Sequence, residues 1–231
     1  MDTEFTPFMR QLEERFKAGT GLPDRSQYKI FYGQVHPAWL LTLGINPGGV
    51  PADTSSDGAN HTSGKPASSS TTYFENNEHD VLDCEWTENP GLRKLLLPLL
   101  GGTLSRVRDD VVKTNLAFRR TAKASQIKKE RDFDESAPFL TEILRVVQPK
   151  LVLLTGPTLA SFNDRFARNI ELLGASQRKE SIRQTIFAAS RVRLRATDTT
   201  ALVVQVAHAS RWSATYGEYD VTGKIRSLME A

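Results

Sequence analysis

The chain has 231 residues, of which 39% are hydrophobic and 25% are charged, and its formal net charge is +3. It is long enough to bury a sizeable core, and no apolar run approaches the roughly 20 residues that span a bilayer. The first ten residues include acids where a signal peptide has a basic head, so we expect a cytoplasmic protein without a membrane partner. The single cysteine, Cys84, excludes an internal disulfide, a four-cysteine zinc site and an iron–sulfur cluster.

Hydrophobic periodicity and turn residues predict elements along the chain. Helices are expected at residues 4–18, 91–101, 135–147, 157–168 and 220–230. Strands are expected at residues 39–43, 110–118, 151–155, 186–195 and 201–207, and a long polar loop at residues 49–72. Alternating strands and helices predict one α/β domain over residues 1–231. Its expected architecture is a three-layer α-β-α sandwich with a mostly parallel central sheet.

Charge is distributed unevenly along the chain. Residues 2–14 and 75–88 are acidic, whereas residues 119–131 and 178–195 are basic. A basic stripe is typical of contacts with nucleic-acid phosphates, and it is equally typical of a solvated protein surface. The charge therefore permits a polyanion partner without requiring one.

The most distinctive stretch runs from Trp39 to Gly49 and reads WLLTLGINPGG. Its apolar run stops at Gly44, and Asn46 stands between that glycine and Pro47-Gly48-Gly49, which predicts a buried strand ending in a tight loop. Ligands bind just outside the carboxyl ends of strands in an open parallel sheet, so an amide there suits a site. The same residues also suit an ordinary turn.

Two further polar residues follow predicted strands. Asn115 lies near the end of the strand 110–118, and His208 follows the strand 201–207. Alone, each has a structural interpretation, as a cap or as a partly buried side chain. Because the carboxyl ends of parallel strands meet at one edge of a sheet, we expect Asn46, Asn115 and His208 to lie there together.

With these motifs the chain resembles the uracil-DNA glycosylase superfamily, especially its mismatch-specific and single-strand-selective branches. Those branches open their site with G-x-N-P-G, matched by residues 44–48, and close it with H-P-S or N-P-S, where this chain has His208-Ala209-Ser210. A central strand of the family carries an asparagine at the pocket floor, for which Asn115 is the natural match. The resemblance covers roughly residues 35–231 in element order.

The resemblance implies a monofunctional DNA glycosylase that flips uracil or a related deaminated or damaged base from DNA and hydrolyses its N-glycosidic bond. Asn46 would orient the attacking water and His208 would stabilise the departing base. The implied base-binding residues are Gly44, Ile45, Pro47, Gly48, Asn115, Tyr73 and Phe74, and one of the two aromatic residues would stack on the base. The implied DNA-binding residues are Ser210, Arg211 and Trp212. We expect a monomer whose partner is DNA with a damaged base, and no cofactor or metal.

Two alternatives stay open. The first motif lacks the catalytic carboxylate of the most active branch of the family. The protein could therefore be a weak or inactive member that binds nucleic acid or a nucleobase. Alternatively, the loop GINPGG could cradle the phosphate of a nucleotide. It lacks, however, the Lys and Ser/Thr of a P-loop and the glycine spacing of a dinucleotide fingerprint.

Overall fold

The computed structural model describes residues 5–22, 27–47, 89–102, 106, 109–121, 124–174, 176–179, 184–208 and 220–231. The helices are α1 (Thr6–Thr20), α3 (Asn89–Leu99), α5 (Lys129–Val147), α6 (Leu159–Phe166) and α8 (Val221–Glu230), with a 3₁₀ turn at Ala124–Gln126. The strands are β1 (Leu40–Gly44), β2 (Val111–Asn115), β3 (Leu151–Thr155), β4 (Ala167–Leu172), β5 (Gln177–Lys179), β6 (Gln184–Leu194) and β7 (Thr200–Val206).

The strands form one seven-stranded sheet in the order β2-β1-β3-β7-β6-β4, and β5 also pairs with β6. Strands β2, β1, β3 and β7 run parallel to one another. Strand β6 runs antiparallel to β7, and β4 and β5 run antiparallel to β6. The predicted α/β class, with a largely parallel centre of an open sheet, is therefore confirmed.

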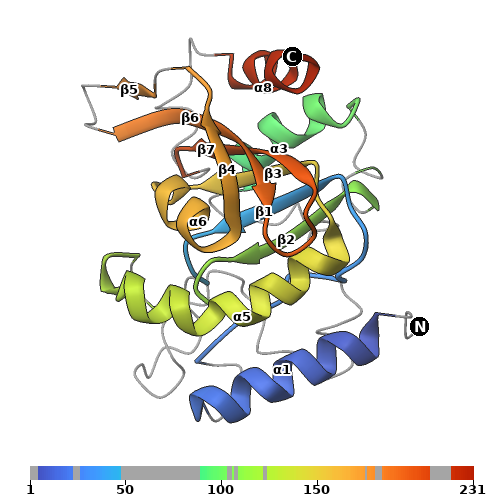
Figure 1. The fold of residues 1–231 in the computed structure, drawn as a ribbon, viewed down its shortest axis with the longest axis vertical. Coiled ribbons are helices and arrows are strands. Elements are labelled where there is room, and N and C mark those ends of the chain that lie inside the picture. The colour runs from blue at the N-terminus through green and yellow to red at the C-terminus, as the bar shows by residue number, and fades with distance from the viewer. Residues whose placement is uncertain are drawn as a thin grey trace.

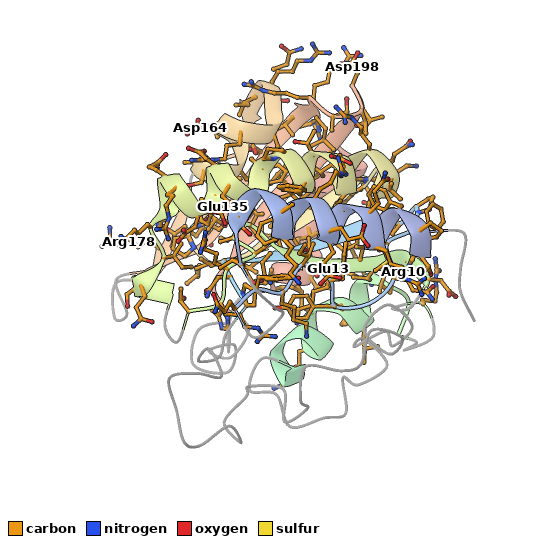
Figure 2. The ribbon with its side chains drawn as sticks, turned by 90° about the horizontal axis from the view of Figure 1, so that it is seen from below. Arg10, Glu13, Glu135, Asp164, Arg178 and Asp198 are labelled. Atoms are coloured by element: carbon orange, nitrogen blue, oxygen red, sulfur yellow. The ribbon has the colours of Figure 1, made fainter. Side chains whose placement is uncertain are left out.

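Helices cover both faces of the sheet because successive strand residues point to opposite sides and most of them are apolar. Helices α1, α5 and α6 pack on the face that includes Leu43 and Val152 (Figure 1). Helices α3 and α8 pack on the other face, which includes Leu151 and Val204. Figure 2 shows α1 lying beside α5, with which it covers the face that includes Leu43 and Val152. Both faces of β3 are thus buried, as its continuous run LVLLT predicts.

A segment upstream of β1 pairs with the chain just beyond β2. Tyr28 forms an antiparallel bridge with Arg119, just beyond the end of β2. Thr114 of β2 donates a hydrogen bond from its hydroxyl to the carbonyl of Ile30. The N–H of Lys29 donates to the carbonyl of Phe118, and the N–H of Arg120 donates to the carbonyl of Gln27, so this pairing satisfies backbone groups just beyond the strand. It also brings Tyr32 to the carboxyl end of β2.

The structure corrects several predicted boundaries. The helix predicted at residues 135–147 begins earlier, at Lys129, where Glu130 and Asp132 occupy its first turn and complement the helix dipole. The prediction of a helix at residues 157–168 is wrong at both ends. The helix begins at Leu159, and it ends at Phe166 because the chain becomes extended at Ala167 and continues as β4. Strands β4 and β5 were not predicted. The loop expected at residues 49–72 lies outside the described residues.

Candidate functional site

The carboxyl ends of the four parallel strands lie at one edge of the sheet. Their register pairs Gly44 with Asn115 and Thr155 with Val206. The polar residue Asn46 thus lies two positions beyond the end of β1, and His208 lies two positions beyond the end of β7. Strand β3 alone separates these two strands, so their backbones are about 10 Å apart at the point where they leave the sheet. The register brings the three polar residues singled out from the sequence to the same edge.

Asn115 is the buried polar residue of this edge, with only 2% of its surface exposed. Its Nδ2 donates a hydrogen bond to the hydroxyl of Tyr32 at 2.8 Å. Its Oδ1 lies against Gly44, so close that a Cβ at residue 44 would overlap it. A glycine is therefore required on β1 for this amide to lie across the strand. Among the described residues, no donor meets Asn115 Oδ1.

Tyr32 is held in place by two lysines. The Nζ atoms of Lys29 and Lys113 lie 4.2 Å and 4.8 Å from the centroid of its ring. An ammonium group is attracted to the face of an aromatic ring, and more strongly where water is excluded. Lys29 is itself buried, with 6% of its surface exposed. None of these three residues was predicted as part of the site, although the aromatic run YKIFY at residues 28–32 is a signal that includes two of them.

Asn46 is half-buried in the loop after β1. Its Nδ2 donates to Thr121 Oγ1 at 2.7 Å and to the carbonyl of Pro47 at 3.0 Å. Because a carbonyl oxygen can only accept, the Pro47 contact fixes which end of the amide carries the nitrogen. Asn46 Oδ1 accepts no hydrogen bond from the residues that the structure describes. Within the described part of the chain, no donor competes with a water or a ligand for this oxygen.

A second glycine shapes the same edge. Gly156 follows β3 with a φ of 125°, and a Cβ there would come within 2.8 Å of Ile45 Cδ1. Its backbone N–H donates to the carbonyl of Val206 at 2.8 Å, while the carbonyl of Ile45 accepts from the N–H of Ala117 at 2.9 Å. These bonds continue the pairing past the ends of the strands. The loop that carries Asn46 is thus bonded to the chain after β2, and the side chain of Ile45 lies close to Gly156 after β3.

The remaining predicted residues differ in what can be said of them. His208 is exposed directly after β7, and Pro47 is buried directly after Asn46. The other residues assigned to base or DNA binding lie outside the described parts of the chain: Gly48, Tyr73, Phe74, Ser210, Arg211 and Trp212.

Arginines of the basic stripe at residues 119–131 are engaged within the protein. Arg119 makes a forked ion pair with Glu135 of α5 (labelled in Figure 2), with Nε 2.8 Å and Nη2 2.9 Å from its carboxylate. Arg131 lies 2.6 Å from the buried carboxylate of Asp132. Arg119 ties α5 to the chain beyond β2, whereas Arg131 and Asp132 are neighbours within α5 itself. Each of these two arginines is thus paired with a carboxylate of the protein.

No family model matches the chain, and no curated protein matches it. The resemblance to the glycosylases therefore depends on the motifs at residues 44–48 and 208–210 and on the order of elements. In the described parts of the chain, no helix is long and apolar enough to cross a membrane. The same parts hold no group of three or more His, Cys, Asp or Glu side chains that could bind a metal ion.

Proposed function

We propose that the protein is a DNA glycosylase that hydrolyses the N-glycosidic bond of uracil or a related deaminated or damaged base flipped out of DNA. The observation that supports this proposal best is the pair of amides at the ends of neighbouring strands. Asn46 and Asn115 each use their nitrogen within the protein, and each keeps an oxygen that accepts no hydrogen bond from a described residue. Such a pair can hold two different parts of one small polar ligand.

Asn46 acts on the water in this proposal. Its Oδ1 accepts a hydrogen bond from the water that attacks the anomeric carbon of the sugar. A carboxamide is a poor base, so Asn46 contributes by orientation rather than by removing the proton. Thr121 supports that role because it accepts from Nδ2, the side of the amide opposite to Oδ1.

His208 acts on the departing base. As the N-glycosidic bond breaks, negative charge develops on the base, and a hydrogen bond from an imidazole to its O2 stabilises that charge. A base bound over the end of β3 would have Asn46 on one side and His208 on the other, because β3 lies between their strands. Asn115 would then face the Watson–Crick edge of the base.

The proposal is tested by incubating the protein with oligonucleotides that carry uracil, hypoxanthine, xanthine or a mismatched thymine, and measuring abasic sites as alkali-labile breaks. We expect breaks at one or more of these bases. Asn46→Ala and His208→Ala should each lower the rate by about a hundredfold. His36→Ala is the matched control, since His36 precedes β1 and lies towards the opposite end of the parallel strands. Absence of breaks at all four bases, or full activity in both variants, would contradict the proposal.

A second function is favoured by the amide at position 46, which offers no carboxylate for deprotonating water. The protein could bind a flipped base or nucleic acid without cleaving it. In that case the oligonucleotides should be bound with an affinity that falls as salt concentration rises, while no abasic sites form. A protein whose GINPGG loop binds nucleotide phosphates should instead ignore DNA and be stabilised by free nucleotides.

A further inference from the structure

The direction of the Asn115 amide decides which ligands can pair with it. A carboxamide can turn by 180° about its last bond with almost no change of shape, which exchanges its oxygen and its nitrogen. In the structure the nitrogen points outwards, to the hydroxyl of Tyr32 at the outer edge of β2. One orientation therefore presents an acceptor to a ligand, and the other presents a donor.

The amide oxygen points along the edge of the sheet, away from Tyr32. It lies over Gly44 of β1, and a Cβ at that glycine would also lie 4.0 Å from Thr155 Oγ1 on β3. Asn115 Oδ1 is thus directed across β1 towards the end of β3, the position between Asn46 and His208. It is buried, and no donor in the described chain satisfies it. A buried acceptor without a partner is costly unless a ligand supplies the donor.

We infer that Tyr32 is the positioning residue for ligand selectivity: its hydroxyl oxygen accepts from Asn115 Nδ2, and in this orientation of the amide Oδ1 is directed towards the ligand. The site then takes bases that present a ring N–H, as uracil and hypoxanthine do. It rejects bases that present a ring nitrogen lone pair at the same place, as cytosine and adenine do. Deamination makes this change in both cases, so one acceptor can recognise both products. The inference depends on the proposed function only for the ligand being a flipped base.

The lysines beside Tyr32 make a clean test possible. Tyr32→Phe keeps the ring between Lys29 and Lys113 and removes only the hydroxyl. The matched control is Tyr28→Phe, because Tyr28 is also buried but donates its hydroxyl to Glu13 of α1, in the other face of the core, at 3.1 Å. Both variants lose one buried hydroxyl, and only one of these hydroxyls contacts Asn115.

The readout is binding to single-stranded oligonucleotides with one 2′-fluoro-2′-deoxyuridine or one 2′-fluoro-2′-deoxycytidine. The fluorine slows cleavage by destabilising the cationic sugar of the transition state, so binding is measured without reaction. We expect the wild-type protein and Tyr28→Phe to prefer the uracil ligand. Tyr32→Phe should lower that preference by about tenfold or more, because its amide is free to turn. Gly44→Ala, which displaces Oδ1 without touching Tyr32, should lower it too.

An unchanged preference in Tyr32→Phe, or no preference in the wild-type protein, would overturn the inference. Failure of the proposed function gives a different result. A wild-type protein that selects the uracil ligand but makes no abasic sites in natural DNA contradicts the glycosylase and supports the role of Tyr32. A protein that makes abasic sites equally at uracil and cytosine contradicts the role of Tyr32 alone. A protein that binds neither ligand contradicts both.

Discussion

Replacing Gly44 with alanine tests the contact between β1 and Asn115 with a single methyl group. The new Cβ would lie closer than 3.0 Å to Asn115 Oδ1, a distance at which one of the two groups must move. The amide is held from behind by its bond to Tyr32. Overpacking of this kind costs about 1–3 kcal/mol, whereas replacing glycine within a strand recovers about 0.5–1 kcal/mol. We therefore expect a net loss of about 1–2 kcal/mol in the free energy of unfolding.

Urea unfolding measures this loss as a lower midpoint with an unchanged slope. The control is Gly19→Ala in α1, where a Cβ meets nothing within 4 Å and alanine should stabilise the helix by up to about 1 kcal/mol. Adding Asn115→Ala to Gly44→Ala removes the collision, so the two changes should couple by about 1 kcal/mol. If Gly44→Ala were as stable as the wild-type protein, or if the double variant were simply additive, the described contact would be refuted.

Three other changes test the edge and the surface. Thr121→Val removes one of the two acceptors of Asn46 Nδ2 and should lower single-turnover cleavage of uracil DNA about tenfold with little change in DNA affinity. Gly156→Ala should destabilise the protein in urea by about 1–3 kcal/mol, because its φ of 125° strains any other residue. The hydrogen bond from Arg168 lowers the pKa of Asp198, so this carboxylate stabilises the fold fully above about pH 4 and progressively less as the pH falls through the lowered pKa. Thermal unfolding of Asp198→Asn should therefore show a weaker loss of stability in acid than the wild-type protein.

Much of the fold can be predicted from the sequence because the central strands are short apolar runs bounded by turn residues. Strand β3 is a continuous apolar run between turn residues, and a strand buried on both faces needs nothing else. Strands β4 and β5 could not be predicted in the same way. Residues of β4 after Ala167 are exposed, so they carry no hydrophobic alternation, and no glycine or proline separates this strand from α6. Edge strands of this kind form because β6 offers free backbone groups, which a local pattern does not reveal.

In the candidate site, too, one part can be predicted from the sequence and another cannot. The edge positions of Asn46, Asn115 and His208 follow from topology, since each closes a strand of one parallel set. Their partners do not follow. Tyr32 is 83 positions away from Asn115, and Thr121 is 75 positions away from Asn46. Such contacts depend on how a segment folds back over a strand edge.

The segment at residues 27–32 joins two tasks that are usually separate. It pairs with the chain just beyond β2, and it carries the hydroxyl that holds Asn115. Tyr28 also fastens it to Glu13 of α1. If this arm detaches locally while the parallel strands stay folded, Asn115 loses its anchor before the sheet loses any strand. Mild heating, or a substitution that weakens α1, would then lower the selectivity between ligands at temperatures well below global unfolding.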